Sequence, residues 1–177
     1  MSSDPQGLLH ILEFHGQQIY ALLTRLTLRA GVADDLLQEL FLKLHTSTGL
    51  ARAENQTAYV FRAAIHLAFD WRRRRRETES LQHEPPTGTG SSPMDRLIAA
   101  EEFEQVVGAM QDLSELTREC LVLRFLQQQE YHEIAGQLGK TEHQVRALCH
   151  KGLDQLRSIL AIAAGAARES EPKGMGD

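Results

Sequence analysis

The sequence has little cysteine and no long apolar run. Only Cys120 and Cys149 occur among its 177 residues, so it offers no disulfide framework, and both lie in helix-like stretches where reduced, packed thiols are expected. No apolar run approaches the roughly twenty residues that a bilayer span needs. No basic segment leads into an apolar one at the N-terminus. We therefore expect a cytoplasmic protein without membrane insertion.

Signatures of catalysis and of metal binding are also missing. The sequence contains no glycine-rich phosphate loop and no G-x-S-x-G motif. Its eight histidines and two cysteines form no H-x-x-x-H or C-x-x-C arrangement with a second pair. Cys149 and His150 are neighbours, which a helix would point apart. We expect no cofactor and no metal site.

Basic charge is scarce overall, but it is concentrated. The formal net charge is −5, and residues 101–160 hold 6 Lys or Arg against 10 Asp or Glu. Residues 1–80 are near balance at 10 against 9, and five of these ten basic residues form the run Arg72–Arg76. A local basic patch on an acidic chain suits a partner that is only partly nucleic acid.

Apolar residues recur at helical spacing, and no alternating strand pattern extends beyond a few residues. The pattern predicts an all-α fold. Helices are expected over about 8–29, from near Asp34 after a break at Gly31, and from about Thr57 into the arginines, with a loop (TSTGLARAENQ) between the last two. Four more are expected near 95–111, 115–127, 131–138 and 142–162.

Residues 78–96 mark a domain boundary. They are rich in Pro, Gly, Ser and Thr and almost free of apolar side chains, which is typical of a flexible linker. The linker separates an N-terminal helical domain, residues 1–77, from a C-terminal one, residues 97–162. The tail, residues 163–177, is predicted to be disordered.

The most specific local motif is YHEIAGQLGKTEHQVRAL. A DNA-reading helix-turn-helix needs a small residue where its helices cross, a residue that tolerates positive φ at the turn, and an apolar residue that docks the second helix. Ala135, Gly139 and Val145 meet these needs at four- and six-residue spacings. Thr141, with Gln144 three residues later, predicts a capping box. The motif favours DNA reading over an ordinary helix pair joined by a glycine turn.

The outward residues that begin the second helix of this motif are candidates for DNA contact. Gln144 and Arg146 carry donors and acceptors that suit purine edges, whereas His150 and Lys151 are placed for the DNA backbone. The full set is Thr141, Glu142, His143, Gln144, Arg146, Ala147, His150 and Lys151.

The stretch FRAAIHLAFDWRRRRRE has two faces on a helix. One face is apolar, and the other is a polar stripe of Arg62, His66 and Asp70 that leads into the arginine run. Cations at a helix C-terminus are favoured by the helix dipole, so a purely structural role is one interpretation. Adjacent arginines repel one another unless an anion is near. This favours phosphate contact by Arg72, Arg73, Arg74, Arg75 and Arg76.

Three segments, in order, resemble bacterial sigma factors of the extracytoplasmic-function (ECF) group of the sigma-70 family. They are DDLLQELFLKL, AYVFRAAIHLAFDWRRRRR and LSELTRECLVLRFLQQQEYHEIAGQLGKTEHQVRALCHKGLDQLR, within roughly residues 8–160. The resemblance implies two helical modules, the family's regions 2 and 4, and a protein that is not an enzyme. Such a protein would bind core RNA polymerase, bring it to promoters and help to melt the minus-ten element.

The resemblance also implies where partners bind. The helix matching DDLLQELFLKL would dock on the clamp helices of the largest polymerase subunit through Asp35, Gln38, Glu39, Leu42 and Lys43. The polar stripe and arginine run would hold the minus-ten element. The loop 45–57, which is poor in aromatics, would hold a flipped base of the melted non-template strand. The helix from Thr141 to about Arg157 would read the duplex minus-thirty-five element, and an anti-sigma protein is a further implied partner.

The sequence departs from the family pattern at several positions. Ala64, Ile65 and His66 stand where Ala-Arg-Asn is common, and some often basic positions of the recognition helix are Leu148, Leu153 and Gln155. Because each missing phosphate contact lowers affinity, we expect weak promoter binding without polymerase.

Two alternatives remain open. One is a stand-alone helix-turn-helix regulator that binds duplex operators as a dimer. The other is an interaction module whose arginine run binds RNA or an acidic protein.

Overall fold

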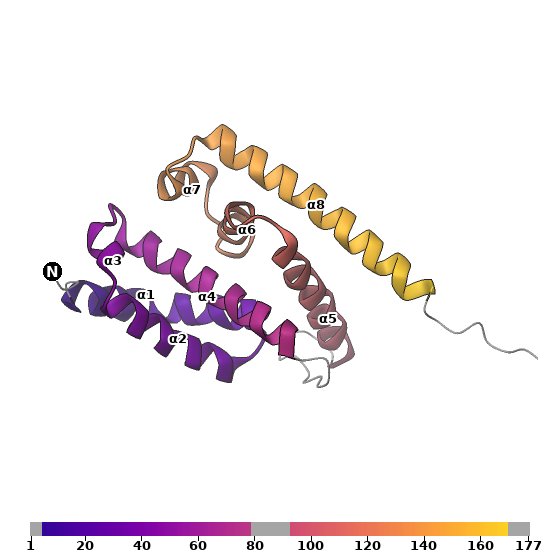
Figure 1. Ribbon diagram of the computed structural model, residues 1–177, viewed down its shortest axis with the longest axis horizontal. Coiled ribbons are helices and arrows are strands. Elements are labelled where there is room, and N and C mark those ends of the chain that lie inside the picture. The colour runs from indigo at the N-terminus through magenta and orange to yellow at the C-terminus, as the bar shows by residue number, and fades with distance from the viewer. Residues whose placement is uncertain (1–4, 79–92, 170–177) are drawn as a thin grey trace, which may run out of the picture.

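The computed structural model describes residues 5–78 and 93–169, in two groups of helices (Figure 1). The first group is α1 (Pro5–Thr27), α2 (Ala30–His45), α3 (Thr48–Arg52) and α4 (Gln56–Thr78). The second group is α5 (Pro93–Ala109), the 3₁₀ turn η1 (Met110–Asp112), α6 (Glu115–Leu121), the π-helical turn η2 (Val122–Leu126), α7 (Tyr131–Leu138) and α8 (Glu142–Glu169). The predicted all-α fold, with a helix-turn-helix in its C-terminal half, is confirmed.

The N-terminal half is a bundle of α1, α2 and α4, with the short α3 at one end. Apolar residues at three- and four-residue spacing give each long helix one stripe that faces the other two. Leu22 and Leu26 of α1, Leu40 of α2 and Ile65 of α4 are at most 1% exposed. Burying a side chain of this size stabilises the fold by about 1.5–3 kcal/mol, so these contacts hold the bundle together.

The turn between α1 and α2 differs from the prediction. Gly31 does not break the helix and Asp34 does not start one, because α2 already begins at residue 30. The break falls on Leu28, whose φ of 59° is in the left-handed region. Thr27 supports this turn, since its buried hydroxyl accepts a hydrogen bond from the backbone N–H of Arg29 at 3.4 Å. A stabilised turn of this kind carries no glycine signature in the sequence.

In the C-terminal half, α8 packs against α5, α6 and α7. Cys120 of α6 and Cys149 of α8 are free and buried, which confirms the expected packed thiols, and a hydrogen bond between them together with burial raises the pKa of Cys120. The helix predicted over 115–127 consists of α6 and the π-helical η2. The N–H of Gln127 donates to the carbonyl of Val122, five residues earlier, at 3.1 Å.

The described helices extend beyond the predicted domain limits. Helix α8 ends at Glu169, so residues 163–169 are helical rather than disordered. Helix α4 reaches Thr78 and α5 begins at Pro93, so both ends of the predicted linker are helical. The rest of the predicted linker, residues 79–92, and of the predicted tail, residues 170–177, lies outside the described residues.

The two halves meet along α4. Helices α5 and α6 lie beside it in Figure 1, and ion pairs join α4 to α5, η1 and α6. Among the described residues, every helix pair with extensive backbone contact lies within one half. The contact between the halves therefore depends mainly on side chains.

Candidate nucleic-acid interface

The helix-turn-helix has the predicted geometry. Gly139 follows α7 with φ 61° and ψ 38°, a left-handed conformation that glycine adopts without steric cost. The N–H of Lys140 donates to the carbonyl of Ala135 at 2.9 Å, which closes the end of α7. Ala135 is 5% exposed and Val145 is fully buried, so α8 docks against α7 through these two positions. The turn holds the beginning of α8 on the surface.

The predicted capping box is present at the start of α8. The N–H of Gln144 donates to Thr141 Oγ1 at 3.2 Å, and the N–H of Thr141 donates to Gln144 Oε1 at 3.0 Å. The amide group of Gln144 is therefore oriented by the helix end before any ligand binds. The structure leaves all the predicted recognition residues exposed: Thr141, Glu142, His143, Gln144, Arg146, Ala147, His150 and Lys151.

Arg146 is held against an aromatic ring. Its guanidinium lies 5.0 Å from the centre of the Tyr131 ring, and Arg124 lies 4.7 Å from the same ring. Arg146 Nη2 is also 3.9 Å from the Glu142 carboxylate one turn earlier. These contacts restrict the rotamers of Arg146 while its side chain stays 55% exposed. Tyr131 was not predicted from the sequence, because no local pattern shows that it packs against two arginines.

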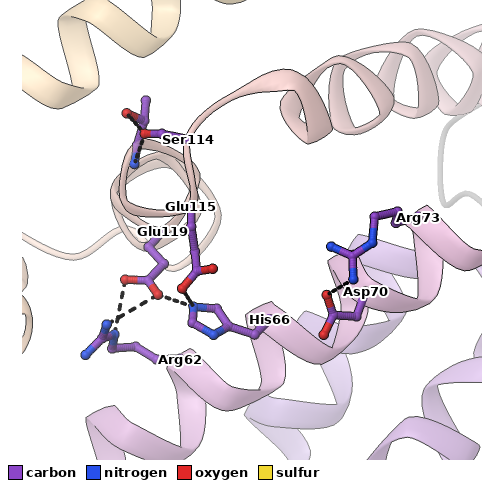
Figure 2. Close-up of polar contacts among 8 residues, drawn as sticks. Arg62, His66, Asp70, Arg73, Ser114, Glu115 and Glu119 are labelled. Atoms are coloured by element: carbon purple, nitrogen blue, oxygen red, sulfur yellow. Dashed lines mark hydrogen bonds and ion pairs between the residues drawn. The ribbon is translucent and has the colours of Figure 1, made fainter.

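The polar stripe of α4 faces the other half of the chain. Arg62 donates to both oxygens of Glu119 on α6, with Nε to Oε2 at 3.1 Å and Nη2 to Oε1 at 3.4 Å. His66 Nε2 contacts the same Glu119 carboxylate and lies 3.3 Å from Glu115 Oε1 (Figure 2). Asp70, one turn further along, pairs with Arg73 at 3.0 Å instead. Two of the three stripe residues are thus bound to α6.

Glu119 is the buried acid of this cluster, with only 1% of its surface exposed. Burial alone raises the pKa of the Glu119 carboxyl, but the hydrogen bond from His66 and the charge of Arg62 outweigh it, so the pKa lies below its usual value. The carboxylate is therefore ionised between two cationic or potentially cationic groups. No role for Glu119 was predicted from the sequence, since its partners are more than fifty residues away.

The five side chains of the arginine run do not lie on one exposed surface. Arg72 is 4% exposed, and its Nη1 donates to the carbonyl of Leu26 at 2.9 Å while its Nη2 pairs with Glu104 of α5. That carbonyl is in the last turn of α1, where carbonyls lack helical partners and a positive charge is favoured. Arg72 therefore closes the end of α1, and the prediction that it lies on an exposed phosphate-binding surface is not supported by its position.

The other four arginines lie closer to solvent. Arg73, Arg74 and Arg76 are exposed, and Arg76 Nη1 is 3.6 Å from Asp112 of η1. The guanidinium of Arg75 lies 5.4 Å from the centre of the Trp71 ring. Arg76 is thereby paired with the other half of the chain, and Arg73 with Asp70 of its own helix.

The predicted polymerase-binding residues share one exposed face of α2. Asp35, Gln38, Glu39, Leu42 and Lys43 are all exposed, and Leu42 has 68% of its surface accessible. An apolar groove of about 390 Å³ lies beside Leu42 and Gln38, lined also by Phe41, Leu37, Gly16 and Leu12. An exposed leucine next to an apolar groove suits a protein partner better than water.

The loop before α4 contains more structure than predicted. Ser47 and Asn55 cap α3 and α4, and the N–H of Ala58 donates to Asn55 Oδ1 at 2.9 Å. The hydroxyl of Tyr59 lies 3.5 Å from Ser47 Oγ, so an aromatic ring flanks the loop although the loop itself has none. A Cβ on Gly49 would lie 2.4 Å from this hydroxyl, so a larger residue at position 49 would require the Tyr59 side chain to move.

Among the described residues, one group of side chains has the composition of a metal site. Ligand atoms of His66, Glu115 and Glu119 lie within 4.8 Å of one another. The guanidinium of Arg62 already binds Glu119 and would repel a cation placed there. We therefore interpret this cluster as an ion-pair network. In the described part of the chain, no helix has the length and apolarity to cross a membrane.

Comparison with known proteins gives two family matches. The model of "Sigma-70 region 2" matches residues 11–78, and that of "Sigma-70, region 4" matches residues 109–158. The two matches correspond to the N-terminal bundle and to the half that contains the helix-turn-helix.

Three individual proteins are similar over most of the chain. RNA polymerase sigma factor CarQ of Myxococcus xanthus is 26% identical over 149 residues, covering 82% of this chain and 84% of the relative. ECF RNA polymerase sigma factor SigX of Bacillus subtilis is 24% identical over 163 residues, covering 86% and 82%. The solved structure of sigma factor RpoE from Bartonella quintana, in complex with the anti-sigma factor NepR, matches with a TM-score of 0.49 and 19% identity, covering 89% of this chain and 96% of that one.

Proposed function

Because the chain belongs to the sigma-70 family of transcription initiation factors, in its ECF group, we propose that it binds core RNA polymerase and directs it to promoters. The polymerase makes the RNA, and this protein supplies recognition and capture of melted DNA rather than a catalytic step. The observation that carries the proposal is that one chain presents a basic α4 followed by a helix-turn-helix, in the order of regions 2 and 4. A stand-alone regulator would need only the helix-turn-helix.

Recognition of the minus-thirty-five element is assigned to α8. Its first turn is exposed, its capping box orients Gln144, and Tyr131 orients Arg146. Both side chains can form paired hydrogen bonds with purine edges in the major groove. His150 and Lys151, further along the same exposed face, are assigned to the DNA backbone.

Capture of the minus-ten element is assigned to α4 and the loop before it. Arg62, His66 and Asp70 form the reading stripe, and the arginines at 73 to 76 hold phosphates. Stacking on a flipped base is assigned to Tyr59, whose hydroxyl lies 3.5 Å from Ser47 Oγ in this loop, and stacking of this kind is worth about 1–3 kcal/mol per base. His66 carries a donor or an acceptor where an amide is common in the family, which gives this chain its own minus-ten preference.

Docking on core polymerase is assigned to the exposed face of α2. Leu42 and the adjacent groove provide apolar area, while Gln38 and Glu39 provide polar contacts at its edge. An anti-sigma protein is a further proposed partner, since any protein that covered both the α2 face and α8 would block the two activities together.

The test is run-off transcription with core polymerase and a library of promoter fragments. The chain should give transcripts from a subset of fragments that share a consensus, and core polymerase alone should not. Gln144→Ala with Arg146→Ala should abolish that selectivity, whereas Gln155→Ala, an exposed change later on α8, should not. If the protein instead binds duplex operators tightly by itself and does not co-elute with core polymerase, the stand-alone regulator is the correct function.

A further inference from the structure

We propose that Tyr131 is a positioning residue for base recognition, whose ring holds the guanidinium of Arg146 ready to read a guanine in the major groove. This inference rests on the proposed function of α8, and it names the base that Arg146 reads and the residue on which that selectivity depends. Tyr131 acts through Arg146 and not by its own contact with a base.

Arg146 is restrained without losing its hydrogen-bond donors. Its guanidinium lies 5.0 Å from the centre of the Tyr131 ring, and its Nη2 is 3.9 Å from the Glu142 carboxylate, which is too far for a hydrogen bond. Within the described residues, this guanidinium donates no hydrogen bond. Contact with the ring therefore limits the rotamers of Arg146 and leaves its N–H donors available to DNA.

The chemistry of the guanidinium indicates which base it reads. Guanine presents two acceptors, O6 and N7, side by side in the major groove, and a guanidinium can donate to both. Adenine presents one acceptor and one donor there, so a group that only donates cannot pair with both. Gln144, the other candidate reader, is held instead through a hydrogen bond that its Oε1 accepts from the N–H of Thr141. Guanine recognition is therefore assigned to Arg146.

The ring of Tyr131 has a fixed place beside the turn. Tyr131 is the first residue of α7, and a capping box of Glu130 and Glu133 closes this helix start. The N–H of Glu130 donates to Glu133 Oε2 at 2.7 Å. The ring is half-buried and packs against the core. A side chain held at a capped helix start gives Arg146 a rigid support.

Arg124 of η2 contacts the same ring and is anchored more firmly. Its guanidinium lies 4.7 Å from the ring centre, and its Nη1 donates to the carbonyl of Gln129 at 2.8 Å and lies 3.3 Å from the Glu130 carboxylate. The side chain of Arg124 is 27% exposed, against 55% for Arg146. Of the two cations at this ring, Arg124 is thus fixed to the protein and Arg146 is accessible to DNA.

The size of the effect follows from the strength of the ring contact. A cation–π contact at an exposed site changes an equilibrium by about two- to fivefold. Because the contact exists before DNA binds, Arg146 loses less conformational freedom when it meets the base. Removing the ring should therefore lower the preference for guanine by about two- to fivefold.

The experiment measures base preference in the minus-thirty-five element with the full chain. Promoter fragments with a randomised element and a transcribed barcode are transcribed by core polymerase with the chain, and the barcodes are sequenced. The same fragments are also selected by binding to the chain without polymerase at low salt. The variants are Tyr131→Leu, Tyr131→Phe, Arg146→Ala and Arg146→Lys. His132→Ala, at an exposed position next to Tyr131, is the matched control.

The proposal predicts a change at one position of the element only. Arg146→Ala and Arg146→Lys should abolish the preference for guanine there, because alanine has no donor and lysine has no paired donors. Tyr131→Leu should lower the same preference by about two- to fivefold, while Tyr131→Phe and His132→Ala should match wild type. In the Arg146→Ala background, Tyr131→Leu should have no further effect. If Tyr131→Leu changes preference equally at all positions, or acts in the Arg146→Ala background, the ring is only structural and the proposal is overturned.

A second measurement locates Arg146 in the absence of DNA. Nuclear magnetic resonance of the full chain records the arginine Nε–Hε groups, and Arg146→Lys assigns the signal of Arg146. The ring should shift this signal in wild type and in Tyr131→Phe but not in Tyr131→Leu, with the same helix content by circular dichroism. An Arg146 signal in wild type at the position of an unstructured arginine overturns the proposal even if Tyr131→Leu does not fold.

The two selections separate this inference from the proposed function. If no promoter is transcribed, but fragments bound by the chain alone show a guanine preference that depends on Tyr131, the proposed function fails and the role of Tyr131 holds. If transcription is promoter-selective and Arg146→Ala changes no guanine preference, the role of Tyr131 fails and the proposed function holds.

Discussion

For a substitution of Arg72, the sequence and the structure predict different outcomes. If Arg72 lay on an exposed basic surface, its loss would weaken DNA binding and leave the free energy of unfolding unchanged. In the structure it is 4% exposed and donates to the carbonyl of Leu26 at the end of α1. We predict that Arg72→Met destabilises the N-terminal half and that the matched change Arg74→Met, at an exposed position of the same helix, does not.

The size of the effect follows from the contacts of Arg72. Losing Nη1 leaves a buried carbonyl without its donor, which costs about 1–3 kcal/mol. The pair with Glu104, whose side chain is 44% exposed, adds at most about 1 kcal/mol. Arg72 Nε is buried without a hydrogen-bond partner, which is unfavourable in the wild type. Removing this atom therefore offsets part of the destabilisation. The sum is roughly 2–3 kcal/mol, a large share of the roughly 4–11 kcal/mol expected for a domain of this size.

Urea unfolding followed by tryptophan fluorescence measures this effect. Trp71 is the only tryptophan of the chain and lies next to Arg72 on α4, so its signal reports on the N-terminal half. Arg72→Met should lower the free energy of unfolding by roughly 2–3 kcal/mol, while Arg74→Met should stay within about 0.5 kcal/mol of wild type. The reasoning is refuted if Arg72→Met is as stable as wild type and loses as much DNA affinity as Arg74→Met.

Three further predictions concern other positions. Gly139→Val should destabilise the C-terminal half by about 1–2 kcal/mol because a β-branched residue is strained at φ 61°, while Gly139→Asn should cost less; thermal unfolding distinguishes them. Glu39→Ala should weaken binding to core polymerase without changing the circular dichroism spectrum, and equal affinity would remove this residue from the docking face. Because pairing with His66 and Arg62 lowers the pKa of Glu119, the ion pairs of Glu119 with α4 should be intact above the ordinary carboxyl pKa of about 4.3 and be lost as pH falls through the lowered value. The melting temperature of wild type should then fall more steeply over this pH range than that of Glu119→Gln.

The helix-turn-helix was predictable from sequence because all of its determinants are local. Gly139 supplies the left-handed turn, and Ala135 and Val145 are at fixed spacings from it. The capping box between Thr141 and Gln144 joins residues three positions apart. Interactions of this range depend only on backbone geometry that every helix shares, so a pattern of residues is enough to identify them.

The turn at Leu28 was not predictable from sequence because its determinants are not local. A leucine at φ 59° is unfavourable by itself, and it is adopted because Thr27 and the packing of α1 against α2 and α4 support it. Gly31 offered a better local signal for a break, yet it lies inside the first turn of α2. Tertiary contacts outweighed the local preference at this point.

Spacing along single helices was enough to predict the helices, their apolar faces and the exposed faces of α8 and α2. Each of these depends on spacing along one helix. No such spacing predicts that Arg72 closes the end of α1 or that Arg62 and His66 bind Glu119 on α6, because these contacts join separate helices. An arginine has the same charge whether it meets a carbonyl, a carboxylate or a phosphate. Which of these it meets depends on parts of the chain brought together only by folding.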